Sequence, residues 1–121
     1  MRVEKLVSTT VAALEDVKAR DIVVLDVRKM TSLFDKVIIA SADSTRQGKA
    51  LSSRVQEKVK GIGAPIHGVE GEQNGEWILV DLGTVIVHIM QPAARQYYNL
   101  EELWTPAKRT RRRATRSTRA A

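Results

Sequence analysis

Inward-facing positions recur with helical spacing in two parts of the chain. The first part predicts an amphipathic helix over about residues 3–19. Its inward positions, three or four residues apart, are Val3, Leu6, Val7, Thr10, Leu14 and Val17. The second helix is predicted to begin at a capping box formed by Ser44 and Gln47 and to end near Lys60, before Gly61.

Short runs rich in β-branched residues predict strands between and after these helices. The expected strand ranges are 22–27, 36–41, 66–70, 76–81 and 85–90. Asn74-Gly75 precedes the last two ranges and is typical of a tight hairpin turn, because both residues tolerate positive φ. Pro92 ends the last strand, and residues 93–104 are expected to form one or two short helical turns.

The predicted order of elements defines the fold class. The strands are apolar on both faces, the two at 22–27 and 36–41 being fully buried, so other layers must cover both sides of the sheet. We therefore expect an α/β layered sandwich with a mixed five-stranded sheet and helices on both faces. The 121 residues suffice for one domain and a real hydrophobic core.

Charge divides the chain into two segments. The domain is expected to cover residues 1–105, and residues 106–121 form a basic tail that we expect to be disordered. Removing the tail's seven basic residues from the 20 in the chain leaves 13, against 14 acidic residues, so the domain is nearly neutral. The basic residues of the tail are Lys108, Arg109, Arg111, Arg112, Arg113, Arg116 and Arg119.

Three features of the composition limit the function classes. The chain contains no cysteine, which excludes disulfides and thiolate metal sites and suits a cytoplasmic location. We expect neither a signal peptide nor a membrane span, because no apolar run approaches the length that either needs. His67 and His88 are 21 positions apart and form no spaced ligand pair, so no metal and no cofactor are expected.

Catalysis has weak support in the sequence. Ser41 and Ser44 lie at a predicted strand-to-helix turn, but the motif of a serine nucleophile is absent, and helix capping explains Ser44. Magnesium-dependent nucleotidyl transfer needs clustered carboxylates, whereas Asp26, Asp35 and Asp81 lie on separate elements. We therefore expect a binding protein and not an enzyme.

Aromatic residues gather near the end of the domain and suggest a docking surface. Residues 95–104 and Trp77 together hold four of the chain's five aromatic residues. Tryptophan, tyrosine and arginine are the side chains that most often anchor protein interfaces. Trp77 and Tyr98 are interpreted as surface residues, while Leu103 and Trp104 fit either a core or a surface role.

Four stretches of the sequence also resemble the ribosomal silencing factor family, the bacterial relatives of the plant iojap protein. They are D-I-V-V-L-D-V, T-S-L-F-D-K-V-I-I-A-S-A-D-S-T-R-Q-G-K-A-L, G-E-W-I-L-V-D-L-G-T-V-I-V-H-I-M and R-Q-Y-Y-N-L-E-E-L-W. With the first helix they cover about residues 1–105 in order. The tail lies outside the family pattern.

The resemblance implies a fold similar to nucleotidyltransferases without their catalytic motif. It implies a translational repressor that docks on a large-subunit ribosomal protein, the universal L-fourteen type, and sterically blocks joining of the small subunit when nutrients run out. Family members in organelles are linked to assembly of the large subunit. A monomer or weak homodimer is expected, and no membrane contact.

The resemblance also implies site residues, carried over by motif position. The residues expected to contact the partner are Trp77, Asp81, Arg95, Tyr98, Leu100 and Glu101. The residues expected to support that surface are His88, Leu103 and Trp104, with His88 orienting a neighbouring carboxylate or carbonyl. Arg111, Arg112 and Arg113 of the tail are expected to make weak, nonspecific contacts with ribosomal RNA.

Two other functions stay open on the sequence alone. One is a large-subunit assembly factor that binds ribosomal RNA mainly through the tail, and its affinity would collapse with salt and with removal of residues 107–121. The other is a divergent nucleotidyltransferase, which would require carboxylates converging on one cleft and magnesium-dependent nucleotide binding.

Overall fold

The computed structural model describes residues 2–104, and the predictions for the tail, including Arg111, Arg112 and Arg113, lie outside the described residues. The helices are α1 (Val3–Asp16), α2 (Thr45–Gly61), α3 (Pro92–Tyr98) and α4 (Leu100–Leu103). The strands are β1 (Arg20–Asp26), β2 (Lys36–Ser41), β3 (Gly68–Glu70), β4 (Trp77–Asp81) and β5 (Val85–Met90). No helix within this range is long and apolar enough to cross a membrane.

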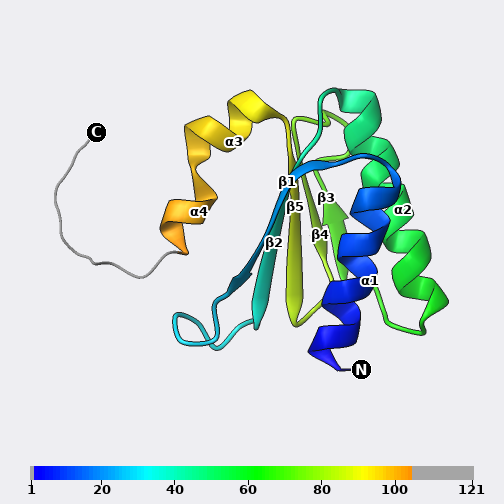
Figure 1. Ribbon diagram of the computed structural model, residues 1–121, viewed down its shortest axis with the longest axis vertical. Coiled ribbons are helices and arrows are strands. Elements are labelled where there is room, and N and C mark those ends of the chain that lie inside the picture. Colours follow the sequence, from blue (N-terminus) through cyan, green and yellow to red (C-terminus); the bar gives the residue numbers. More distant parts are fainter. Residues whose placement is uncertain (1, 105–121) are drawn as a thin grey trace, which may run out of the picture.

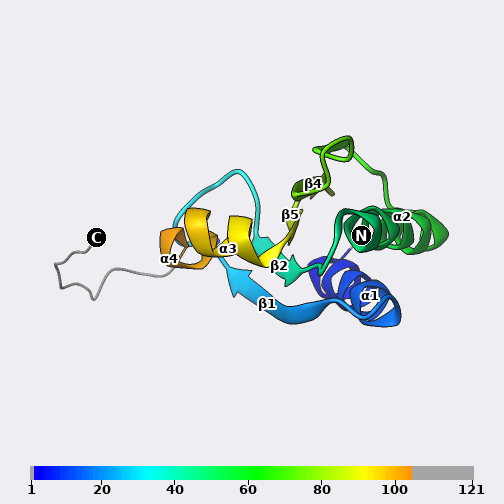
Figure 2. The same ribbon diagram turned by 90° about the horizontal axis from the view of Figure 1, so that it is seen from above.

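The five strands form one mixed sheet in the order β1-β2-β5-β4-β3. The central strands β2 and β5 are parallel, and the other neighbouring strands are antiparallel. Helices α1 and α2 cover one face, and α3 and α4 lie against the other (Figures 1 and 2). The expected α/β sandwich with helices on both faces is confirmed, whereas the likeness to nucleotidyltransferases stays a prediction.

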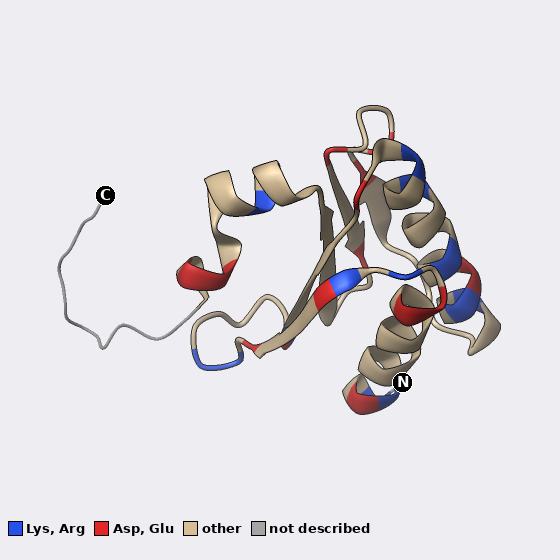
Figure 3. Cartoon of the chain, turned by 45° about the horizontal axis from the view of Figure 1, so that its top comes forward, with Lys and Arg blue, Asp and Glu red and all other residues tan. Residues whose placement is uncertain are grey.

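Burial is most complete in the central strands. Every residue of β5 is buried, and so is every residue of β2 after Lys36. Charged residues lie mainly on the helices, in the loops and at the ends of strands (Figure 3). The buried side chains form two apolar clusters. One lies between the sheet and α1–α2, and a smaller one lies on the opposite face around Val37, Ile39 and Met90.

Strand β1 is less buried than predicted. It lies at the edge of the sheet, its residues are exposed or half-buried, and Val24 is 41% exposed. A short β-branched run is compatible with an edge or a central strand, so composition alone could not place it. The pairing with β2 shifts register between Arg20 and Val23, where Asp21 has a φ of 51°. Such a bulge is common at sheet edges.

The connection around Asn74-Gly75 also differs from the prediction. It is a six-residue loop, 71–76, in place of a two-residue turn, and of the two residues only Gly75 has positive φ. A Cβ atom at Gly75 would collide with the Thr45 side chain at the start of α2. Glycine at this position therefore allows the loop to approach the helix closely and also allows the positive φ of the turn.

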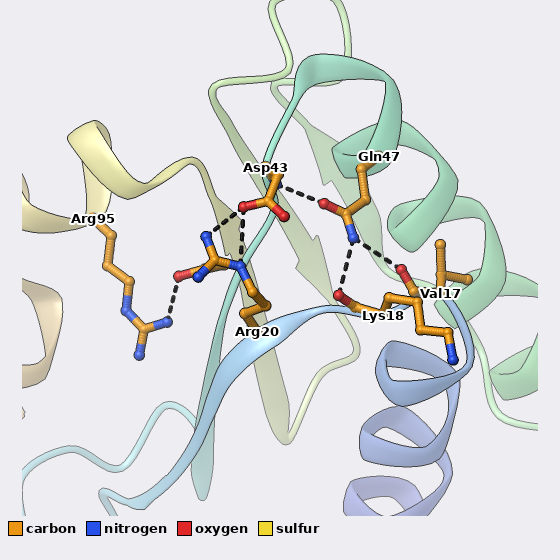
Figure 4. A network of polar contacts seen from close by, with 7 residues as sticks. Val17, Lys18, Arg20, Asp43, Gln47 and Arg95 are labelled. Carbon is orange, nitrogen blue, oxygen red and sulfur yellow. Dashed lines mark hydrogen bonds and ion pairs between the residues drawn. The ribbon is translucent and has the colours of Figure 1, made fainter.

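The start of α2 is held by the predicted cap. Ser44 Oγ accepts the Gln47 backbone N–H at 3.0 Å. Gln47 Oε1 accepts the N–H of Asp43, and Gln47 Nε2 donates to the carbonyls of Val17 and Lys18, both at 3.0 Å (Figure 4). The Gln47 side chain thus ties the start of α2 to the end of α1.

A buried hydroxyl on α1 provides a test of the packing. Thr10 is fully buried, and its Oγ1 has no hydrogen-bond partner within residues 2–104. Thr10→Val keeps the shape of the side chain and removes the unsatisfied oxygen, so it should raise the free energy of unfolding by about 1 kcal/mol in urea denaturation. Thr10→Ser, which keeps the hydroxyl and loses a methyl group, should lower it. A Thr10→Val variant less stable than the wild type would contradict this packing.

Candidate functional surface

Strand β4 presents alternate side chains to opposite faces of the sheet. Ile78 and Val80 are fully buried toward α1 and α2, whereas Trp77, Leu79 and Asp81 are half-buried on the other face. This is the alternation predicted for a strand with one covered side. The indole and the carboxylate therefore lie on the outer face of an otherwise apolar strand.

His88 supports Trp77 from the neighbouring strand. Trp77 Nε1 donates a hydrogen bond to His88 Nδ1 at 3.0 Å, and the ring centroids are 5.9 Å apart. His88 is 8% exposed, and burial lowers its pKa to about 4. The expectation that His88 orients a carboxylate or carbonyl was wrong, because its Nδ1 accepts from the indole N–H. The neutral imidazole fixes the orientation of Trp77.

Three aromatic rings form a continuous group on this face. The Trp77 and Tyr98 rings are 4.6 Å apart at 45°, and the Tyr97 and Tyr98 rings are 4.9 Å apart at 85°. Tyr98 is 53% exposed and Tyr97 is 82% exposed. Tyr97 was missed as a candidate, although its position beside Tyr98 in the aromatic segment was a usable signal. These three residues are called the aromatic platform below.

Hollows flank the aromatic platform on two sides. One of about 240 Å³ is lined by Glu70, Gly71, Trp77 and Leu79. The other, of about 320 Å³, is lined by Glu76, Gln91, Ala93, Ala94, Tyr97 and Tyr98. Aromatic side chains beside shallow hollows are typical of protein-binding surfaces.

The border of the aromatic platform is acidic. Residues 61–94 contain four carboxylates and neither lysine nor arginine. Glu70 and Glu76 are exposed and line the hollows. Asp81 is half-buried, and its Oδ1 accepts the Gly83 N–H at 2.8 Å, which shapes the turn to β5. Glu70 and Glu76 therefore place two carboxylates beside the hollows, where they could pair with basic side chains of a partner.

Arg95 and Glu101 bond to each other, in contrast to the partner contacts expected of them. Arg95 Nε and Nη2 donate to the two Glu101 oxygens at 3.0 Å and 3.2 Å. Arg95 Nη1 donates to Ser41 Oγ at 2.8 Å, and the Arg95 side chain is only 11% exposed. The structure gives both residues an internal role, because three N–H groups of the guanidinium are already used.

The burial of side chains on and after α4 differs from the roles predicted for them. Leu100 and Trp104 are half-buried against the smaller cluster, where the Trp104 ring packs edge-on against Phe34 at 5.5 Å. Leu100 therefore contributes to the core side of α4 and not mainly to the outer surface. Leu103, expected to support the site, is instead 66% exposed. Asn99, with φ 49° and ψ 56°, separates α3 from α4 and sets which side of α4 faces the sheet.

The two serines considered as nucleophiles both form structural hydrogen bonds. Ser44 caps α2, and the Ser41 hydroxyl accepts from Arg95 while being 3% exposed. Within residues 2–104, no three His, Asp or Glu side chains are placed to hold a metal ion. Residues 2–104 thus form a small α/β domain with an exposed aromatic group bordered by carboxylates.

Similarity to known proteins identifies the family of this domain. The family model described as "Ribosomal silencing factor during starvation" matches residues 1–121. The ribosomal silencing factor RsfS of Chromobacterium violaceum is 50% identical over 104 residues, which cover 86% of this chain and 85% of that protein. The RsfS of Haemophilus influenzae is 42% identical and covers 82% and 97%. The chain belongs to the ribosomal silencing factor family, RsfS.

Organelle proteins and solved structures agree with this assignment. A mouse protein named "Mitochondrial assembly of ribosomal large subunit protein 1" is 34% identical over 98 residues, covering 78% of this chain and 43% of that protein. A crystal structure of a Chromobacterium violaceum protein has a TM-score of 0.85 at 48% identity, covering 88% of this chain and 92% of that one. A Bacillus halodurans structure has a TM-score of 0.76 at 33% identity, covering 84% and 94%.

The buried imidazole predicts a pH dependence of stability. The pKa of His88 is about 4 in the folded chain against an ordinary value of 6.5. Between these values the unfolded chain binds a proton that the folded chain does not, so stability falls as the pH is lowered through this range. Urea unfolding should show that His88 contributes a loss of about 2 kcal/mol between pH 7 and pH 5.

The matched control is His88→Gln, which keeps a hydrogen-bond acceptor for Trp77 but does not titrate. It should lose less stability than the wild type over the same pH interval. Equal losses in the two proteins would show that His88 does not carry the effect.

Proposed function

We propose that this protein is a translational repressor that binds the large ribosomal subunit and sterically blocks joining of the small subunit. The observation that carries the proposal is the aromatic platform with its acidic border, in a member of the ribosomal silencing factor family. The proposed contact is the universal L-fourteen type ribosomal protein at the intersubunit face. Binding there in the cytoplasm would lower translation when nutrients are limiting.

The charge of the surface favours a protein partner over RNA. Ribosomal RNA presents phosphates, which the carboxylates of Glu70 and Glu76 would repel, whereas basic side chains of a ribosomal protein would pair with them. Trp77 and Tyr98 supply rigid apolar area, which is the usual source of affinity at the centre of an interface. Acidic border and aromatic centre therefore point to the same kind of partner.

A binding role needs no catalytic group, and we propose that the protein is not an enzyme. In α/β sheets, ligands usually bind at the carboxyl ends of parallel strands where the strand order reverses. Here the carboxyl end of β2 is occupied by the bond between Ser41 and Arg95. Affinity and bulk are sufficient to prevent two subunits from meeting.

One alternative retains a specific observation in its favour. The mouse relative is named for assembly of the ribosomal large subunit, and the tail carries seven basic residues that fit phosphate contacts. An assembly factor acting through RNA would depend on the tail, whereas the proposed repressor depends on the aromatic platform. The two can be separated by substituting each region in turn.

Sedimentation with purified ribosomal subunits tests the aromatic platform. The full-length protein should travel with the large subunit in a sucrose gradient and reduce the yield of joined ribosomes. Tyr98→Ala should lower the affinity by about tenfold to a hundredfold, because it removes half of the Trp77–Tyr98 stack from a hot-spot position.

Leu33→Ala is the matched control, since Leu33 is a 79% exposed apolar side chain on the β1–β2 loop and is not one of the three residues of the aromatic platform. It should bind like the wild type. If the wild type stays at the top of the gradient at moderate salt, the proposed function fails. If Tyr98→Ala binds normally, the aromatic platform is not the contact.

Deletion of residues 107–121 tests the RNA alternative. The deletion should weaken binding to the large subunit only modestly and make it less sensitive to salt, because each lost phosphate contact lowers the salt dependence. Binding at 50 mM and 200 mM salt would be compared for the two proteins. Complete loss of binding on deletion would favour the assembly factor.

A further inference from the structure

The two short helices that carry Tyr97 and Tyr98 are attached to the sheet with little buried area. Neither α3 nor α4, here called the C-terminal arm, has a fully buried residue. Partly buried Ala94 and Leu100 are its apolar contacts with the smaller cluster, together with Trp104 just after it. Side-chain hydrogen bonds therefore add to the apolar and aromatic contacts that hold the arm in place.

Arg95 is the group that joins the C-terminal arm to the sheet. Its Nη1 donates to Ser41 Oγ at 2.8 Å, at the carboxyl end of β2, a strand 54 positions away in the chain. Figure 4 shows Arg95 reaching toward β2 and β1 from the arm. Ser41 is 3% exposed and cannot move without disturbing the central strand pair. The bond thus connects the arm to the most rigid part of the fold.

The same guanidinium fixes the angle inside the arm. Asn99 takes a left-handed conformation between α3 and α4, so the two helices do not form one continuous helix. Arg95 before the turn and Glu101 after it form two parallel N–H to oxygen bonds, at 3.0 Å and 3.2 Å. Such a fork constrains orientation as well as distance.

We propose that Arg95 is the positioning residue of the docking surface: its bonds to Ser41 and Glu101 hold the C-terminal arm so that Tyr98 stacks on Trp77. This inference rests on the proposed function and assigns to Arg95 a role other than partner contact. Lysine cannot replace it, because one ammonium group cannot form the planar fork with Glu101 and also reach Ser41.

A double-mutant cycle tests this role. The affinity of full-length protein for purified large subunits would be measured for the wild type, Arg95→Lys, Tyr98→Ala and the double variant. If Arg95 acts by placing Tyr98, Arg95→Lys weakens binding by about tenfold and the double variant binds no more weakly than Tyr98→Ala. A purely global effect on folding would not produce this non-additivity.

Arg28→Lys is the matched control. Arg28 forms a similar fork with Asp26, through Nε and Nη2, but its side-chain hydrogen bonds go to Asp26 and none of them joins the arm. It should bind like the wild type. Wild-type affinity of Arg95→Lys, or effects of Arg95→Lys and Tyr98→Ala that add in full, would overturn the inference.

Hydrogen exchange separates this inference from the proposed function. If the wild type does not bind the large subunit, the proposed function fails, and the role of Arg95 is then read from the free protein. Amides of residues 93–103 should exchange faster in Arg95→Lys than in Arg28→Lys, while the exchange of β2 and β5 stays unchanged. Equal exchange of the arm in both variants would overturn the positioning role.

Discussion

The structure depends on one constraint, the burial of the parallel strands β2 and β5 on both faces. All six residues of β5 are buried, and the five residues of β2 after Lys36 are buried as well. Both faces of this pair must be covered for the chain to fold. Helices α1 and α2 cover one face, and the smaller cluster with the C-terminal arm covers part of the other (Figure 2). The proposed docking surface lies where this second cover ends, along the outer side of β4.

This arrangement explains why polar side chains occur in strands that the fold needs to bury. His88 lies on β5 beside β4, and its neutral imidazole accepts the Trp77 N–H, so that neither polar group is left unpaired. Burial keeps the imidazole neutral, with a pKa of about 4, and the neutral ring is the form that can accept the bond. The Trp77 ring in turn packs against the Tyr98 ring. The buried strand therefore positions the exposed rings through one side-chain hydrogen bond and one aromatic contact.

The elements that the sequence predicts best are those with a continuous local signal. The ranges of β2 and β5 agree with the prediction residue for residue, because an apolar run bounded by polar residues marks both ends. Strand β1 has the same composition but an edge position, which depends on the order of strands. The Arg95–Glu101 pair and the hydrogen bond from Trp77 to His88 could not be predicted from the sequence either. Each contact depends on how separate elements meet in the fold. Motif position singled out Arg95 but could not distinguish a partner contact from an internal bond.

The central claim is that the aromatic platform faces a ribosomal protein. A photoreactive phenylalanine derivative placed at Tyr98 in the full-length protein, irradiated with purified large subunits, would report the neighbour of this position directly. We expect a cross-link to a ribosomal protein of the L-fourteen type, with much less product when the derivative replaces Leu33. Cross-links at position 98 that map only to ribosomal RNA, or equal products from both positions, would contradict it.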